Sequence, residues 1–200
     1  VYTARLAIDG PAVGLFAVRP GEDAPVRTID DLSDGRWLGP SAFTLDGARL
    51  VYVTSGAVSD ELFSAPLDGG MPVRLTQAPT GTLDTFAIAP SGTHVVFSRS
   101  SELYSVPIDG GVPTKLSAHG VDLGAGFVIA DDSARVFYAG YLPQSRPRSE
   151  PYSVPLMGGT PTKLNGSATS GEILAILIAS DGSRLVYGTY SNGVSALYSV

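Results

Sequence analysis

The sequence predicts an all-β fold in which four-stranded antiparallel sheets repeat along the chain. The first observation behind this prediction is a hairpin motif, in which two short alternating runs are joined by a glycine turn. Its three full copies read LFSAPLDGGMPVRLT at 62–76, LYSVPIDGGVPTKLS at 103–117 and PYSVPLMGGTPTKLN at 151–165. The first residues of a fourth copy, ALYSV, stand at 196–200. The second observation is another motif that alternates with this hairpin, so that the two together recur about every 40 to 50 residues.

The second motif is also a pair of strands, joined by a short polar turn. Its copies read SAFTLDGARLVYVT at 41–54, FAIAPSGTHVVFSR at 86–99, FVIADDSARVFYAG at 127–140 and ILIASDGSRLVYGT at 176–189. The turns are Asp46-Gly47, Ser91-Gly92, Asp132-Ser133 and Asp181-Gly182. Glycine suits such turns because it adopts a positive φ without a steric cost. One period thus holds four strands, A to D, expected in the second complete unit at about 84–90, 94–99, 102–108 and 112–117.

The apolar and charged residues predict the order of these strands in each sheet. Strand A has the most continuous apolar run, as in residues 173–178, which is typical of a strand buried on both faces. Strand D is short and polar, with Lys115 and Lys163 near its end, which favours an outer edge where lysine discourages unwanted pairing. The expected order across a sheet is therefore A-B-C-D.

Prolines recur at two places in the hairpin motif. Those at the start of strand D, where an edge tolerates the missing N–H, are Pro72, Pro113 and Pro161. Those at the end of strand C, beside the turn, are Pro66, Pro107 and Pro155. Because a proline inside strand C would remove a ladder bond, its recurrence predicts a fixed irregularity there, such as a β-bulge.

The repeat predicts a β-propeller made of four-stranded antiparallel blades. A single sheet of this kind cannot bury both faces, whereas copies stacked around an axis can, and this period is typical of propeller blades. Residues 1–200 are expected to form one propeller segment with about five blade slots, three complete and two partial. The slots are expected at about 1–30, 40–76, 84–117, 124–165 and 173–200. A β-sandwich is the alternative, and it explains the turn spacing but not the internal similarity.

The two motifs together resemble the TolB-like, WD-repeat-like family of bacterial β-propellers. The resemblance lies in the strand–(P/D)-(D/S)-G–strand element followed by LYSVPIDGG-x-P-x-(K/R)-L-(T/S), and it covers nearly the whole chain. It is specific for the fold and not for the function, since the family includes periplasmic TolB proteins, propeller domains in front of serine peptidases and secreted proteins. It implies a bacterial protein of the periplasm or the extracellular space. Ser133 and Met157 depart from the pattern, and both are expected to leave the fold intact.

The two terminal slots are expected to be incomplete. Residues 1–3 align with the end of a strand B, residues 15–29 align with strands C and D, and the last unit stops within strand C. We therefore expect this chain to be part of a larger propeller, for which the family implies six or seven blades. The alternative is a homodimer in which two chains complete each other's terminal blades.

The composition excludes several classes of function. Apolar residues make up 44% of the chain, which is enough to bury a core, and the net charge of -6 gives no general attraction to nucleic acid or anionic lipid. The absence of cysteine excludes disulfides, thiolate catalysis and cysteine metal sites. No run of about 18 apolar residues occurs, so no membrane span is expected.

The sequence also predicts no catalytic, metal-binding or cofactor-binding residues in this chain. It has no G-x-S-x-G element, and its two histidines, His94 and His119, are expected to be an ordinary strand residue and an ordinary loop residue. The acidic pairs Asp30-Asp31 and Asp131-Asp132 lack the spacing of a calcium loop. No phosphate-binding or dinucleotide-binding glycine motif occurs either.

One connection between strands B and C is the candidate binding site. The interval from Tyr138 to Tyr152 is 14 positions, longer than in the other complete units, and it carries Tyr141, Arg146 and Arg148. The first unit is expected to have a loop of similar length, Thr3 to Leu15, without the charge. Trp37, the only tryptophan, is expected in the first D-to-A connection on the same face. Tyrosine, tryptophan and arginine are common anchors of protein interfaces. The alternatives are a solvated insertion without a partner and a tryptophan packed between blades.

These observations predict a non-enzymatic binding or scaffolding module that presents face loops to a protein, peptide or glycan. An alternative from another class is a propeller domain that gates a serine peptidase or glycan-active enzyme whose catalytic domain is not in this chain. A purely structural repeat without a ligand is the third alternative.

Overall fold

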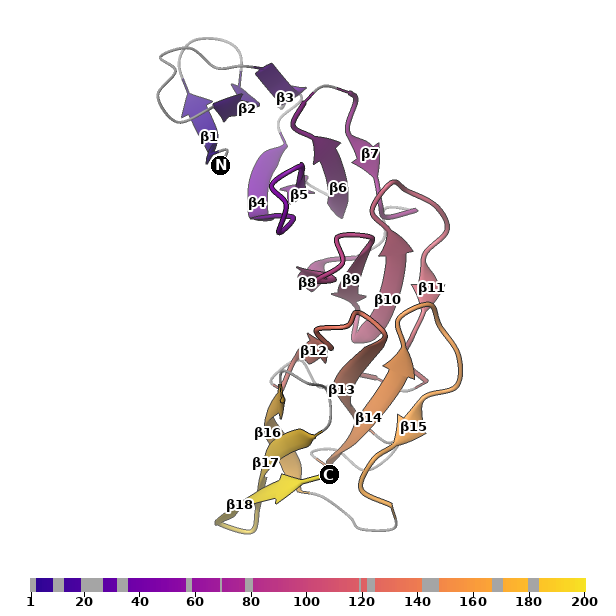
Figure 1. Ribbon diagram of the computed structural model, residues 1–200. Helices are drawn as coiled ribbons and strands as arrows, with labels where there is room; N and C mark the ends of the chain where they lie inside the picture. The colour runs from indigo at the N-terminus through magenta and orange to yellow at the C-terminus, as the bar shows by residue number, and fades with distance from the viewer. Residues whose placement is uncertain are drawn as a thin grey trace. The chain divides into compact units, whose positions relative to one another are not determined.

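The chain is all-β, as the sequence predicts. The computed structural model describes residues 3–8, 13–18, 27–31, 36–56, 59–68, 70–77, 81–118, 120–121, 125–141, 148–166, 171–179 and 184–200. Within these ranges eighteen strands form five antiparallel sheets (Figure 1). None of the described residues belongs to a helix that could cross a membrane.

The sheets have the predicted A-B-C-D order. Three have four strands: β4(Trp37–Phe43)-β5(Arg49–Ser55)-β6(Asp60–Pro66)-β7(Val73–Arg74), β8(Leu83–Ile88)-β9(His94–Arg99)-β10(Glu102–Pro107)-β11(Thr114–Lys115) and β12(Phe127–Ile129)-β13(Arg135–Tyr141)-β14(Ser149–Pro155)-β15(Thr162–Lys163). Two have three strands: β1(Thr3–Ile8)-β2(Val13–Val18)-β3(Arg27–Asp31) and β16(Glu172–Ile178)-β17(Leu185–Ser191)-β18(Val194–Ser199). The prediction of three complete and two partial units is therefore confirmed.

The chain is divided into two compact units, each with its own core. The first contains Val1–Leu83 and the turn Pro107–Pro113, and the second contains Asp84–Val106 and Thr114–Val200. In the first unit, Leu15 of β2 packs against Leu50, Tyr52, Ala65 and Leu67 of the next sheet.

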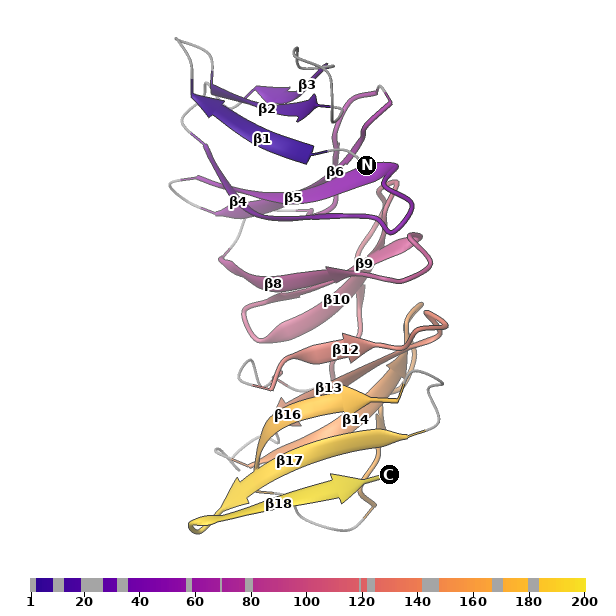
Figure 2. The same cartoon turned by 60° about the vertical axis from the view of Figure 1, so that its left-hand side comes forward.

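The second unit buries two layers of apolar side chains. One lies between the sheets β8–β11 and β12–β15 and includes Val96, Leu103 and Tyr138. The other lies between β12–β15 and β16–β18 and includes Phe137, Ile173 and Tyr187. Figure 2 shows the three strands of the last sheet side by side. Each sheet of this unit thus buries apolar side chains against a neighbouring sheet, as expected of sheets that cannot bury both faces alone.

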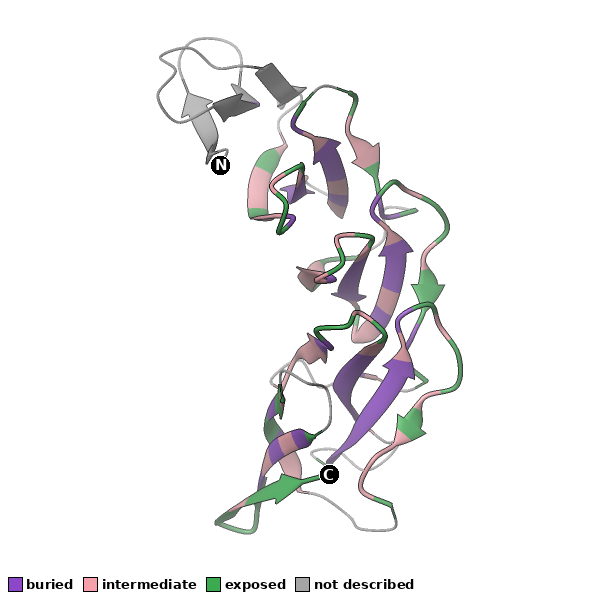
Figure 3. Cartoon of the chain, in the orientation of Figure 1, coloured by how far each residue is buried: buried purple, intermediate pink, exposed green. Residues whose placement is uncertain are grey.

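The burial of strand A differs from the prediction. The inner strands of a sheet are the buried ones: the central residues of β9 and β13 are all buried, whereas β8 is largely half-buried or exposed. Even the apolar β16 alternates between buried Ile173 or Ile176 and exposed Leu174 or Leu177. The expectation that strand A is buried on both faces is wrong, because A lies at a sheet edge while B has a strand on each side. Figure 3 shows the contrast between buried β14 and exposed β11 and β18.

The A-to-B turns use the predicted positive φ. Gly47 has φ 68° and its N–H donates to the carbonyl of Thr44 at 2.8 Å. Ser133 adopts φ 57° and donates in the same way to Ala130, also at 2.8 Å. Serine therefore keeps the turn that glycine makes elsewhere, and this departure from the pattern leaves the local fold intact. The equivalent Asp181-Gly182 lies outside the described residues.

The C-to-D turns explain the recurring prolines. The N–H of Gly158 donates to the carbonyl of Pro155 at 2.9 Å, and Gly159, with φ 139°, lies over the proline ring, where a Cβ would be 3.5 Å from the ring carbons. The predicted bulge is wrong, because the pairing of β13 with β14 continues to Arg135 opposite Pro155 without a shift. Leu156 donates to Ala134, so the alternation of the ladder turns the proline nitrogen away from β13.

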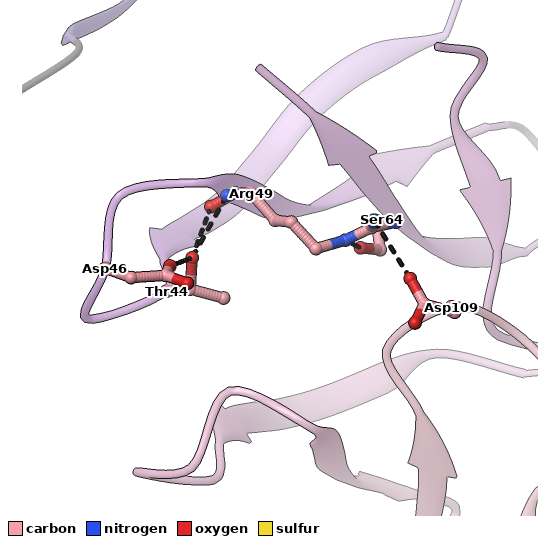
Figure 4. A network of polar contacts seen from close by, with 5 residues as sticks. All are labelled: Thr44, Asp46, Arg49, Ser64 and Asp109. Atoms are coloured by element: carbon pink, nitrogen blue, oxygen red, sulfur yellow. Dashed lines mark hydrogen bonds and ion pairs between the residues drawn. The ribbon is translucent and has the colours of Figure 1, made fainter. Parts of the chain in front are cut away.

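An arginine at the start of strand B links several of these turns in the first unit (Figure 4). The Nε of Arg49 donates to Ser64 Oγ at 2.8 Å, and its terminal nitrogen lies 3.0 Å from the carboxylate of Asp109. The backbone N–H of Arg49 donates to Thr44 Oγ1 at 3.0 Å, and this hydroxyl donates to Asp46 at 2.6 Å. The pKa of Asp46 is lowered mainly by the hydrogen bond from Thr44 and, to a smaller extent, by a hydrogen bond from a backbone N–H.

The same arrangement is kept in one sheet of the second unit and lost in another. Arg135 donates to Ser153 Oγ at 2.7 Å, as Arg49 does to Ser64. His94 stands at the arginine position of β9, and the buried Oγ of Ser105, the counterpart of Ser64, has no hydrogen-bond partner among the described residues. The residue equivalent to Asp109 in the following turn is the exposed Met157. The arginine and its carboxylate partner are therefore replaced together.

Restoring both residues should restore the contacts. We expect His94→Arg to increase the free energy of unfolding by about 0.5–1 kcal/mol, because the guanidinium can donate to Ser105 Oγ. Met157→Asp alone should have no such benefit, and the two together should show a further coupling of about 0.2–1 kcal/mol. Urea denaturation of the wild type, the two single variants and the double variant gives the free energies of unfolding for this double-mutant cycle. The control, Arg135→His, should be destabilising, and a strictly additive double variant without any increase for His94→Arg would contradict the expectation.

Candidate functional site

The structure brings together two of the four predicted binding residues. Tyr141 is the last residue of β13, half-buried, and Arg148 is the exposed residue directly before β14. Both lie at the same end of one sheet, because Tyr141 pairs with Ser149. Arg146 lies outside the described residues.

Trp37 does not lie in a connection, and it belongs to the other unit. It is the first residue of β4, where it pairs with Ser55, so the predicted place in a D-to-A connection is wrong. Its side chain is 62% exposed, so the alternative of a tryptophan packed between sheets is also wrong. The A strand simply begins earlier than the apolar pattern suggested.

The B-to-C connection after Tyr141 is the longest one in the sheets described here. Pairing of β13 with β14 extends from Tyr138↔Tyr152 to Tyr141↔Ser149, so the connection is residues 142–148. The other four sheets connect B to C through 9–12, 56–59, 100–101 and 192–193. The predicted long loop between Thr3 and Leu15 is wrong, since β1 and β2 pair continuously from Thr3↔Val18 to Ile8↔Val13. Only the sheet β12–β15 therefore keeps the extended connection.

An ion pair that the sequence analysis missed recurs in the sheets, and one copy of it lies in the sheet that carries this connection. A glutamate near the start of strand C pairs with a basic residue of strand D in every four-stranded sheet. The pairs are Glu61 with Arg74, Glu102 with Lys115 and Glu150 with Lys163. The signal was the recurrence of E-L-F, E-L-Y and E-P-Y at the start of the hairpin motif. The D-strand lysines therefore hold strand D to strand C in addition to protecting an edge.

Glu150 differs from its two counterparts because it is buried. Its side chain is 2% exposed, against 22% for Glu61 and 41% for Glu102. Its Oε2 accepts a hydrogen bond from Asn165 Nδ2 at 2.5 Å and lies 3.4 Å from Lys163 Nζ. Removing a carboxylate from water costs several kcal/mol unless such partners replace the water. Amide and ammonium together offset that cost here.

The bond from Asn165 to Glu150 goes together with a second substitution in the same sheet, Pro151. In the other sheets a hydroxyl accepts from a C-strand N–H, from Leu62 to Thr76 at 3.3 Å and from Leu103 to Ser117 at 3.0 Å. The equivalent of Leu62 and Leu103 is Pro151, which has no N–H, and the equivalent of the hydroxyl residue is Asn165. The side-chain amide donates to the buried carboxylate instead of accepting from the backbone.

Gly140 pairs with Glu150 across the two inner strands, and the next pair on the same face is Tyr138 with Tyr152. Tyr138 and Tyr152 have ring centroids 5.5 Å apart, and a Cβ on Gly140 would lie 3.1 Å from the Tyr152 ring. Burial raises the pKa of Tyr138 to about 12, and burial followed by the charge of Glu150 raises the pKa of Tyr152. Both phenols are therefore protonated at neutral pH. The repeat has Thr54, Arg99 or Thr189 at the position of Gly140, so glycine is a further departure at this end.

Backbone hydrogen bonds fix both ends of the connection. Tyr141 N donates to the carbonyl of Gly120 at 2.7 Å. On the other side, Ser149 N donates to Gly171 at 3.2 Å, and Ser149 Oγ accepts from Ile173 N at 2.8 Å. The connection thus leaves from two points held by neighbouring segments, with Arg148 exposed beside one of them.

The charged groups at this end of the sheet differ in their exposure. Glu150 is too buried to reach a substrate, and the described residues contain no group of three or more side chains that could hold a metal ion. Glu150 holds the start of β14 to Asn165 and Lys163, whereas the exposed charge at this end of the sheet is that of Arg148.

Comparison with known proteins supports the fold. No protein-family model matches the chain. Among solved structures, the tricorn protease matches 95% of this chain with a TM-score of 0.65 and 13% identity, and this chain spans only 20% of that protein chain. A chain of the nidogen/laminin complex matches 92% of this chain, over 70% of its own length, with a TM-score of 0.54 and 12% identity.

A protein assigned as TolB from Agrobacterium tumefaciens matches the whole chain, over 76% of its own length, with a TM-score of 0.55 and 15% identity. Identities this low establish the fold alone. The predicted resemblance to TolB-like propellers is confirmed at that level, and the chain is a β-propeller module.

Proposed function

We propose that this chain is a non-enzymatic binding module that presents the connection 142–148 to a protein or peptide partner, in a bacterial protein of the periplasm or the extracellular space. One observation carries the proposal. Three departures from the repeat, Gly140, Pro151 and Asn165, lie at one end of one sheet beside the buried Glu150, where the longest connection between described strands B and C begins and ends. A repeat that serves only the fold has no reason to change so many positions at one place, whereas functional sites break local rules.

The charge of the connection indicates the chemistry of the partner. Arg148 is exposed, Arg146 lies in the same connection, and the chain as a whole has a net charge of -6. Guanidinium groups bind carboxylates through paired hydrogen bonds, and tyrosine adds apolar contact at low entropic cost. The half-buried Tyr141 can add such contact at the base of the connection. The partner surface is therefore expected to be acidic with an apolar centre. Trp37, which lies in the other unit, is not part of this proposal.

A crosslinking experiment followed by affinity measurement tests the proposal. A photoreactive residue at Gln144 should capture a partner that mass spectrometry identifies, whereas the same residue at the exposed Met157 should not. With the purified partner, Arg146→Ala combined with Arg148→Ala should weaken binding at least about tenfold, which is about 1.4 kcal/mol. The matched control is Arg184→Ala, an exposed arginine directly before β17, which should leave the affinity unchanged. Equal affinities for all three proteins would refute the proposal.

A second candidate function is a propeller that gates a serine peptidase or glycan-active domain. Its support is the match to one fifth of the tricorn protease chain, which is named as a protease. This function requires a catalytic domain outside the described sheets. Labelling of the native protein by a fluorophosphonate probe, at a serine outside residues 1–200, would favour it over the binding module.

A further inference from the structure

Three turns of the first unit are bonded to one another and form what we call the turn cluster, residues 44–49, 67–72 and 107–113. They join β4 to β5, β6 to β7 and β10 to β11, and the last of them, Pro107–Pro113, belongs to the first unit although β10 and β11 do not. The N–H of Leu67 donates to the carbonyl of Ala48 at 2.9 Å, which ties the first turn to the second.

Two further contacts hold the third turn to the other two. The carboxylate of Asp109 lies 3.0 Å from the guanidinium of Arg49, at the end of the first turn (Figure 4). Gly110 lies so close to Val73, directly after the second turn, that a Cβ on this glycine would be 2.6 Å from Val73 Cγ1. The three turns therefore present their exposed side chains on one surface.

The tips of these turns expose large apolar side chains. Leu45 is 86% exposed, Met71 is 84% exposed and Val112 is 72% exposed. Tight turns call for glycine, proline or small polar residues, so the backbone of these turns has no need of a leucine, a methionine or a valine at an exposed tip. Apolar side chains that gather on an exposed surface with a polar rim are typical of an interaction site.

Each of the three turns also exposes a carboxylate, that of Asp46, Asp68 or Asp109. Arg49 is the one basic residue in the sequence of the three turns, and its guanidinium is bonded to Asp109 and to Ser64. Acidic residues thus outnumber basic ones three to one, and the cluster is negatively charged around its apolar tips.

The repeat itself does not require this combination. The residues of the next two sheets at the positions of Leu45, Asp46, Asp109 and Val112 are Pro90, Ser91, Met157 and Thr160. These four residues include no carboxylate and one large apolar side chain, yet Gly92 and Gly158 make the same backbone turns. The acidic and apolar surface is therefore a property of the turn cluster and not of the turns in general.

We propose that the turn cluster binds a basic segment of a partner polypeptide, with large apolar side chains between its arginine or lysine residues. Contact with the apolar tips supplies affinity, and the carboxylates select a cationic partner by charge complementarity. The same charge repels nucleic acid and anionic lipid. A second copy of this chain suits the cluster less well, because its Arg74, Lys115 and Lys163 already pair with glutamates of their own sheets.

The two methionines of the chain provide a direct test. Met71 belongs to the turn cluster, and Met157 is an exposed residue in a turn of the other unit. The probe is a short synthetic peptide in which arginine and leucine alternate, added to the chain with carbon-13-labelled methionine methyl groups. We expect a saturable shift of the Met71 methyl signal and an unchanged Met157 signal. Peptides with glutamate in place of arginine, or serine in place of leucine, should bind at least about tenfold more weakly.

Two variants separate the apolar contribution from the charge. Leu45→Ser and Asp68→Asn should each weaken binding of the arginine–leucine peptide, and the two together should weaken it at least about tenfold. Asp68→Asn should also make the affinity less dependent on salt, whereas Leu45→Ser should keep the salt dependence of the wild type. The matched control is Asp131→Asn, which removes an exposed carboxylate from a turn of the other unit and should leave the affinity unchanged. An unchanged Met157 signal verifies that each variant is folded.

Two results would overturn the proposal. One is a peptide that shifts both methionine signals alike or shifts neither, since the acidic surface would then be unselective or unused. The other is a dimer of the chain without peptide, dissociated by Leu45→Ser in sedimentation, which would assign the cluster to a second copy. The variants of Arg146 and Arg148 lie outside the turn cluster, so this proposal and the proposed function are tested separately.

Discussion

Replacing Glu150 with alanine is expected to lower the free energy of unfolding by about 2–3 kcal/mol, whereas Glu102→Ala should cost less than about 1 kcal/mol. The two residues hold the same position in the repeat and make the same type of ion pair, but Glu150 is 2% exposed and Glu102 is 41% exposed. Alanine at 150 leaves the amide of Asn165 and the ammonium of Lys163 without their shared acceptor in a half-buried place. At position 102, water can take the place of the lost carboxylate beside Lys115.

Urea denaturation of the two variants, followed by circular dichroism, measures this difference. Glu150→Gln is the informative control, because it keeps an acceptor for Asn165 and removes the charge that faces Lys163. It should fall between the wild type and Glu150→Ala. Equal losses for Glu150→Ala and Glu102→Ala would show that burial does not matter at this position.

The same substitution connects the fold with the proposed function. If the connection 142–148 is the binding surface, Glu150→Ala should weaken partner binding as well, since the carboxylate fills the space below its base. Glu102→Ala should leave binding unchanged, because its sheet connects B to C through residues 100–101 only. If Glu150→Ala leaves the affinity for the partner unchanged, the partner binds at another surface.

The sequence was sufficient to predict the repeating sheet because each of its strands is specified locally. Glycine at turns such as Gly47 and the recurring prolines act within a few residues, and alternation then fixes which strands are neighbours. The burial of strand A was not predictable in this way. An apolar run such as residues 173–178 shows that a strand can be buried, but only the sheet order shows that A lies at an edge.

The candidate site shows the same limit. That Tyr141 and Arg148 share one end of a sheet follows from strand alternation, and this part was predictable. The role of Glu150 was not, because it depends on Pro151 and Asn165, whose effects meet only after the register of β14 and β15 is known. Pro151 and Asn165 look like unrelated changes in the sequence, and Glu150 looks like its counterparts in the other copies.

Tyr138→Ala is expected to have the largest effect of all, a loss of about 3–5 kcal/mol, because it empties the space of a fully buried aromatic side chain. Tyr138 is 1% exposed and packs with Val96, Leu103 and Tyr152 in the layer between two sheets of the second unit. The cavity would remove contacts from both sheets at once, so the loss should appear as a lower urea midpoint for the whole unit.

The matched control is Tyr198→Ala, which removes a tyrosine of another aromatic pair. Tyr198 stacks on Tyr187 at 5.3 Å, much as Tyr138 stacks on Tyr152, yet it is 48% exposed on the edge strand β18. Its loss should cost only the stacking and a part of the apolar contact, about 0.5–1.5 kcal/mol. Similar losses for both tyrosines would mean that the aromatic pair itself stabilises each sheet. The expected difference would show instead that stability comes from the apolar layer between neighbouring sheets, because the two aromatic pairs have the same geometry and differ in their burial.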